Sequence, residues 1–149
     1  MQGDEPLIKP ESIDSIIKNI KEDEKADIST LIRVIKDEDE INNPNLVKCV
    51  IDNNSFALYF SRSKIPFERK AGIATFYGHL GIYGYKRNAL FKMTEAAQTP
   101  LERTESLEQL RALETGMKIK TTVVDFVPVG IDTLEDLAKF KSIVTEKLI

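Results

Sequence analysis

The sequence predicts an α/β fold with a mixed sheet, contained in a single domain over residues 1–149. Two observations lead to this fold class. Segments with helical periodicity alternate with segments rich in β-branched residues, which is typical of a sheet covered by helices. In addition, two neighbouring strand segments are separated by a short turn, which indicates an antiparallel hairpin. A mixed sheet is therefore favoured over a purely parallel one.

The first half of the chain predicts one helix, several strands and a long loop. Isoleucines recur at helical spacing after Pro10, a residue that suits a first helical turn, so we expect a helix over residues 10–23. The turn Asp52-Asn53-Asn54 joins the two strands of the expected hairpin, and residues 61–74 read as a loop. The strand segments expected in this half are 28–35, 46–51, 56–60 and 76–85.

The second half predicts three helices and one strand. A short helix is expected near Ala89, and a longer one over residues 101–114, because its leucines at 107, 110 and 113 share one face. Gly116 is placed to end that helix in the left-handed conformation. Residues 118–126 predict a strand, and Thr133 is placed to cap a last helix.

Composition and charge exclude several functional classes. Hydrophobic residues make up 42% and charged residues 30% of the chain, as in ordinary globular domains, and the net charge is -3. Basic and acidic residues are interspersed along the chain, so nucleic acid is not an expected partner. No apolar run approaches the roughly 20 residues that span a bilayer, and no secretory signal opens the sequence. The one cysteine, Cys49, has no partner for an internal disulfide, which favours a cytoplasmic protein.

Two aspartates are candidates for a magnesium site. Asp4 stands in Gln2-Gly3-Asp4-Glu5-Pro6, where glycine permits a tight turn and proline stiffens the exit. Asp132 follows Gly130 at the expected strand-to-helix junction. Carboxylates held in such loops suit a divalent ion that bridges to phosphate oxygens. The alternatives are a turn aspartate that bonds its own backbone and a carboxylate that helps to cap the last helix.

The lone histidine, His79, is a candidate for substrate binding. Strand alternation places it on one face with Gly81, Tyr83 and Tyr85. A polar and aromatic face with room left by a glycine would suit a sugar. The alternative is a histidine that is satisfied within the packed interior. With one histidine and one cysteine in the chain, a zinc site is not expected.

Three further residues carry polar groups suited to a sugar acid. Arg62 follows the strand 56–60, and an arginine binds a carboxylate with two parallel hydrogen bonds. Glu105 and Gln109 share a helix face with Glu102 and offer hydrogen bonds to hydroxyl groups. A solvated surface arginine and a solvated helix face are the alternatives.

Six motifs in one order resemble the CMP-Kdo synthetases, the 3-deoxy-manno-octulosonate cytidylyltransferases, almost from end to end of the chain. The order, more than any single motif, makes the resemblance specific. The motifs are Gln2-Gly3-Asp4-Glu5-Pro6, residues 43–48 (NPNLVK), 57–66 (ALYFSRSKIP), 79–85 (HLGIYGY), 105–111 (ESLEQLR) and 130–133 (GIDT).

The resemblance implies that the anomeric hydroxyl of Kdo attacks the α-phosphorus of CTP and that pyrophosphate leaves. It implies that Asp4 and Asp132 hold Mg²⁺ and are catalytic. It also implies a homodimer that acts in lipopolysaccharide biosynthesis. The residues implied to bind substrate are Gln2, Arg62, His79, Tyr85, Glu105 and Gln109.

The chain departs from that family at its beginning. The family opens with a strand and a phosphate-holding loop, and this sequence has no such glycine-rich cradle. We therefore expect an incomplete three-layer fold of the nucleotide-diphospho-sugar-transferase type, comprising the sugar- and metal-binding and dimerisation part. We also expect it to be inactive alone and to leave strands 28–35 and 118–126 without neighbours on one side. A cytidylyltransferase for a related sugar acid and a noncatalytic, shortened paralogue that binds sugar or dimerises are the alternatives.

Overall fold

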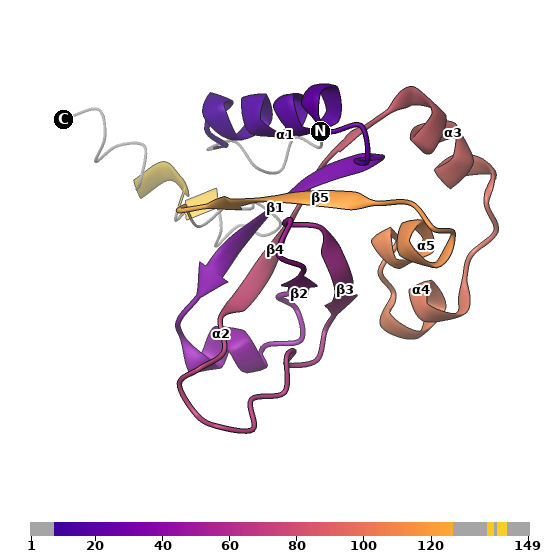
Figure 1. The fold of residues 1–149 in the computed structure, drawn as a ribbon. Coiled ribbons are helices and arrows are strands. Elements are labelled where there is room, and N and C mark those ends of the chain that lie inside the picture. Colours follow the sequence, from indigo (N-terminus) through magenta and orange to yellow (C-terminus); the bar gives the residue numbers. More distant parts are fainter. Residues whose placement is uncertain (1–7, 127–136, 139, 143–149) are drawn as a thin grey trace.

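The computed structural model describes residues 8–126, 137, 138 and 140–142. These residues form a mixed five-stranded sheet in the order β3-β2-β4-β1-β5 with helices packed around it (Figure 1), which confirms the α/β class. The helices are α1 (Pro10–Glu22), α2 (Glu38–Asn42), α3 (Arg87–Glu95), α4 (Pro100–Glu105) and α5 (Gln109–Glu114). The strands are β1 (Ile28–Ile35), β2 (Lys48–Ile51), β3 (Ala57–Ser61), β4 (Phe76–Tyr85) and β5 (Ile119–Val124).

Strand β1 lies inside the sheet and has a partner on each side. It pairs with β4 in antiparallel and with β5 in parallel orientation, and all but one of its residues are buried. The expectation that residues 28–35 would lack neighbours on one side is therefore wrong. The β2–β3 hairpin is confirmed, and β2 also pairs with β4.

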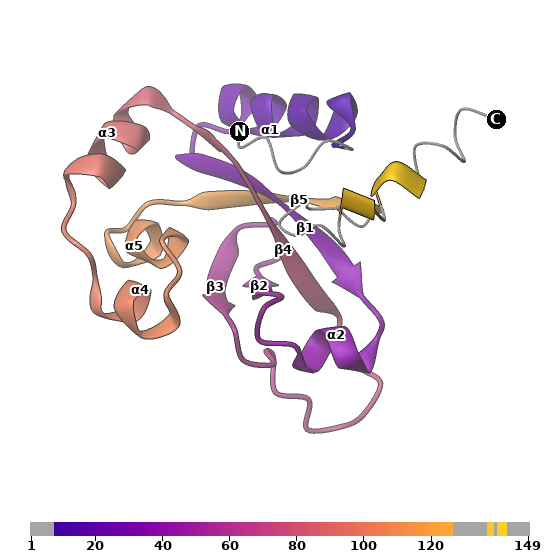
Figure 2. The same cartoon turned by 180° about the vertical axis from the view of Figure 1, so that it is seen from behind.

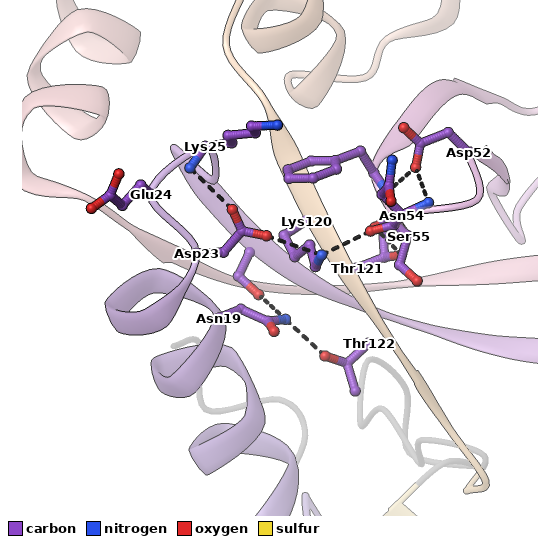
Figure 3. A network of polar contacts seen from close by, with 12 residues as sticks. Asn19, Asp23, Glu24, Lys25, Asp52, Asn54, Ser55, Lys120, Thr121 and Thr122 are labelled. Carbon is purple, nitrogen blue, oxygen red and sulfur yellow. Dashed lines mark hydrogen bonds and ion pairs between the residues drawn. The ribbon is translucent and has the colours of Figure 1, made fainter.

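The outer edge of β5 is partly covered by the tip of the hairpin. Phe56 forms an isolated antiparallel bridge with Lys120, and the amide of Thr121 donates to the carbonyl of Ser55 at 2.8 Å. In Figure 3, Lys120 stretches between the carboxylate of Asp23, at 3.0 Å, and the carbonyl of Asn54, at 2.8 Å. The sheet thus curls until its two ends meet near the hairpin tip, which corrects in part the expectation that residues 118–126 lack neighbours on one side.

Helices cover the sheet from two sides, as the opposite views in Figures 1 and 2 show. Helix α1 packs on one face, where Ile16 joins Leu31 and Leu80 in a small cluster. The larger core lies between the other face and helices α3 to α5, and Phe60 and Leu110 are fully buried in it. Within the described ranges, no helix combines the length and apolar character needed to cross a membrane.

Two local elements differ from the sequence prediction. The helix expected over 101–114 is broken into α4 and α5 by Ser106, whose φ of 55° ends α4 in the left-handed conformation. The short helix α2 was not predicted. The side chain of Asp37 caps it by accepting a hydrogen bond from the amide of Asp39 at 2.9 Å. Gly116, with φ of 80°, follows α5 as expected.

Candidate functional site

One face of β4 carries a row of aromatic side chains with the histidine among them. The ring centroids of His79 and Tyr83 are 5.3 Å apart, and those of Tyr83 and Tyr85 are 5.9 Å apart. Phe60 of β3 meets His79 edge-on at 4.9 Å. The pairing of β4 with β1 is irregular between Leu80 and Tyr83, where β4 has two extra residues. Because the number of extra residues is even, the side chains of β4 continue to alternate between the same two faces of the sheet. The predicted shared face of His79, Tyr83 and Tyr85 is therefore confirmed.

The contacts of the buried Thr30 hydroxyl assign the tautomer of His79. The Thr30 hydroxyl lies 2.9 Å from Nε2 of His79 and donates its single hydrogen to carbonyl oxygens of β4, 2.8 Å away at Ile82. It therefore accepts from Nε2–H, and Nδ1 is left as a hydrogen-bond acceptor. Burial lowers the pKa of His79 to about 3. The imidazole is thus neutral at physiological pH and suited to accept a hydroxyl hydrogen.

The tyrosines of this row are partly buried phenols near a carboxylate. Burial raises the pKa of Tyr85, and the nearby charge of Glu108 raises it further. The same two causes, together with Tyr85 itself, raise the pKa of Tyr83. Glu108 is exposed, and its carboxylate has no hydrogen-bond partner among the described residues. The sequence reasoning missed Glu108, although its position three residues after Glu105 was a usable signal.

Arg62 and Glu105 hold the end of β3 against the end of α4. The Glu105 carboxylate accepts hydrogen bonds from the Ser61 hydroxyl at 2.6 Å and from the Arg62 amide at 2.9 Å. The Arg62 guanidinium donates to three carbonyls, those of Glu105, Pro44 and Ser106, at 2.8, 3.1 and 3.4 Å. A guanidinium has five N–H groups, so two remain without a partner among the described residues, one on each terminal nitrogen.

The predicted polar row on one helix face does not form. Glu102 is buried and paired with Arg111, Glu105 is turned to β3, and Gln109 begins the separate helix α5. Gln109 is 7% exposed, and its side-chain amide has no hydrogen-bond partner among the described residues. Of the three, Gln109 therefore has the side chain most available to a ligand.

A crevice of about 740 Å³ lies at the carboxyl ends of the parallel strands β1 and β5. Lys9, Arg33 and Phe126 are among its lining residues. In doubly wound folds, ligands bind outside these strand ends. Gln2, Asp4 and Asp132 lie outside the described residues. Within the described residues, no three acidic, histidine or cysteine side chains gather as metal ligands.

The segments that lead to the two aspartates start side by side at this crevice. Nζ of Lys9 lies 3.6 Å from Asp125 Oδ1 and 5.8 Å from the centre of the Phe126 ring. Asp4 is five residues before Lys9 and Asp132 is six after Phe126, spans of at most roughly 17 to 21 Å. A metal site shared by Asp4 and Asp132 is therefore within reach and remains a prediction.

The structure does not join the sugar-side residues in one described hollow. The crevice and a second hollow of about 930 Å³ beside the hairpin tip (Figure 3) are lined by other residues. The shared cavity predicted for His79, Tyr85, Arg62 and Gln109 stays a prediction.

Comparison with known proteins gives a consistent result. Residues 1–119 match the family model described as cytidylyltransferase. The chain is 46% identical to a 3-deoxy-manno-octulosonate cytidylyltransferase of Fusobacterium nucleatum over 98% of its own length and 60% of the relative's. It is 50% identical to the enzyme of that name from Thermodesulfovibrio yellowstonii, over 92% of the chain and 56% of the relative.

A solved structure, that of a CMP:2-keto-3-deoxy-manno-octonic acid synthetase complexed with CTP, superposes with a TM-score of 0.93 at 35% identity. The match covers 99% of this chain and 61% of that one. The chain thus spans about 60% of the length of the first relatives that it matches.

Proposed function

Because the chain belongs to the cytidylyltransferase family, we propose that it supplies the sugar-acid side of the active site of a CMP-Kdo synthetase, which forms CMP-Kdo and pyrophosphate from CTP and Kdo. The observation that carries this proposal is the identity of 46% and 50% to proteins of that name along nearly the whole chain. The fold of the described residues, close to a synthetase complexed with CTP, supports it.

The described side chains offer complementary groups to a polyhydroxylated sugar acid. The two remaining N–H groups of Arg62 would bind the carboxylate. Nδ1 of His79 would accept a hydrogen bond from one hydroxyl, and the unpaired amide of Gln109 would both donate and accept. Tyr85 presents a phenol that stays protonated, because its pKa is raised by burial. Glu105 would act mainly by fixing the position of Arg62, and Gln2 is proposed to contact substrate.

Asp4 and Asp132 are the residues that would hold Mg²⁺, an ion that prefers carboxylate oxygens. Bound there, the ion would neutralise charge on the phosphate oxygens. The chain's own contribution to the reaction is positioning. By fixing the sugar acid on β3, β4 and α5, the protein would set its anomeric hydroxyl in line with the α-phosphorus of CTP.

The proposed assignment also implies a setting for the protein. We propose that it acts in the cytoplasm as a homodimer in lipopolysaccharide biosynthesis. The resemblance of its motifs to the synthetase family supports this setting.

Calorimetric titration of Kdo into the 149-residue chain tests the proposed function. We expect binding by the wild type and about tenfold weaker binding by Arg62→Lys, because lysine lacks the planar fork. Arg103→Lys is the matched control, since the Arg103 side chain is exposed on α4 and makes no hydrogen bond among the described residues. Equal affinity of wild type and Arg62→Lys would contradict the role of Arg62.

Turnover separates the synthetase from the alternatives. We propose that the chain alone releases little pyrophosphate from CTP and Kdo, and that mixing it with the amino-terminal half of a relative restores release. Kdo binding without restored release would favour a noncatalytic paralogue. Preference of the restored enzyme for 8-amino-Kdo over Kdo would favour a related sugar acid.

A further inference from the structure

Glu102 of α4 and Arg111 of α5 form a buried, two-armed ion pair. Their side chains are 3% and 15% exposed. Nε of Arg111 donates to Oε2 of Glu102 at 2.7 Å, and a second short contact joins Nη2 to Oε1. This bidentate geometry fixes both the distance and the relative orientation of the two helices. The pairing lowers the pKa of Glu102 and raises that of Arg111.

The same two side chains also form hydrogen bonds with the backbone at the end of α3 and at the start of α4. Nη1 of Arg111 donates to the carbonyl of Met93 at 2.9 Å and makes a longer contact of 3.5 Å with that of Ala96. Oε2 of Glu102 accepts a hydrogen bond from the amide of Thr99, the N-cap residue of α4, at 3.2 Å. The pair therefore connects three successive helices through two buried, hydrogen-bonded side chains.

The residues between Glu102 and Arg111 include the junction of α4 and α5, which carries the candidate sugar-binding residue Gln109. Ser106 takes the left-handed conformation, and the amide of Leu107 donates to the Glu102 carbonyl at 3.2 Å. Gln109 follows within the same short span, two residues before Arg111. Because α5 has six residues, it is too short to hold its own orientation, and tertiary contacts must set it.

From this geometry we infer that Glu102 and Arg111 are positioning residues, which fix the α4–α5 junction so that Gln109 and Glu108 face the sugar acid. The inference rests on the proposed function, because it names the same site. A buried ion pair is weak evidence for stability, since the cost of desolvating both charges offsets their attraction. Its fixed geometry is a better account of why charged residues, and not apolar ones, occupy these positions.

The test uses Arg111→Lys, which keeps the charge but loses the fork, and the near-isosteric Glu102→Gln. Arg103→Lys is the control, with the same chemical change on the exposed side of α4. Two quantities are measured on folded protein, well below its unfolding midpoint. They are the affinity for Kdo and the rates of amide hydrogen exchange at Leu107 and Leu110, with amides of β1 as the internal reference.

We expect Arg111→Lys and Glu102→Gln to weaken Kdo binding about tenfold, as small misplacements of binding groups do. Exchange at Leu107 and Leu110 should speed up at least about tenfold through local opening, while β1 is unchanged. Arg103→Lys should alter neither quantity. If Arg111→Lys fails to fold, Glu102→Gln carries the comparison.

The outcomes separate the two proposals. A lowered unfolding midpoint with unchanged affinity and unchanged exchange at the junction would mean that the pair only stabilises the fold, which overturns the inference. Faster exchange without weaker binding would overturn it as well. Absence of Kdo binding by the wild type would instead overturn the proposed function, and the exchange rates would still show whether the pair holds the junction.

Discussion

Replacing Thr30 by valine would remove one hydroxyl from the centre of the sheet without changing the shape of the side chain. Thr30 is completely buried, and its hydroxyl joins Nε2 of His79 to the carbonyl of Ile82. In Thr30→Val, that N–H and that carbonyl both lose this partner. A buried polar group left unsatisfied costs about 1–3 kcal/mol. We therefore expect the free energy of unfolding to fall by about 2–4 kcal/mol, allowing for a partial rescue of one group.

Urea unfolding measures the stability change, and nitrogen NMR of the single histidine reports its tautomer without ambiguity. We expect the wild-type imidazole to be neutral with its hydrogen on Nε2, and Thr30→Val to lose that preference. Thr30→Ser keeps the hydroxyl and is the control, with a loss of about 1 kcal/mol for one buried methyl group. A hydrogen on Nδ1 in the wild type, or a Thr30→Val protein within about 0.5 kcal/mol of wild type, would refute the reasoning.

Further expectations concern pH, packing and backbone conformation. The folded pKa of His79, about 3, lies below the ordinary value of 6.5. The unfolded state therefore takes up the proton first, and stability should be full above pH 6.5 and fall below it by up to about 1.4 kcal/mol per pH unit until pH 3. Stability measured against pH should lose this slope in His79→Gln. Gly84→Ala should lower stability by about 1–3 kcal/mol, because its Cβ would lie 2.4 Å from Ile16, whereas Gly81→Ala meets nothing within 4 Å and should be neutral in the same urea assay. Ser106→Gly should raise the unfolding free energy by a few tenths of a kcal/mol, since glycine accepts a positive φ without strain, and a lower melting temperature would contradict this.

The strands were predictable because their signals are local. Residues 28–35 and 76–85 form strands with the expected bounds, since long runs of β-branched and aromatic residues with turns on either side leave little choice. The neighbours of β1 were not predictable in the same way. Its partner β5 lies far along the chain, and no local sequence pattern indicates that these two strands pair.

The break between α4 and α5 shows where tertiary contacts override periodicity. Leu107 and Leu110 fit a continuous helix, but the carboxylate of Glu105 is turned toward β3 and Glu102 is paired with Arg111. These contacts are better satisfied when the chain changes direction at Ser106. The predicted polar row on one helix face does not form for this reason. The predicted aromatic face of β4 is correct, because the side chains of β4 still alternate between the two faces of the sheet despite the irregular pairing with β1.

The position of β5 beside β1 has a kinetic consequence. The hairpin, β4 and β1 find one another over modest separations along the chain, whereas β5 must close a loop of roughly ninety residues before its first pair forms. We therefore expect β5 to dock last during folding. Until it docks, one edge of β1 is an open template for pairing with other chains, and a nascent polypeptide halted before Ile119 is the form of this protein in greatest need of a chaperone.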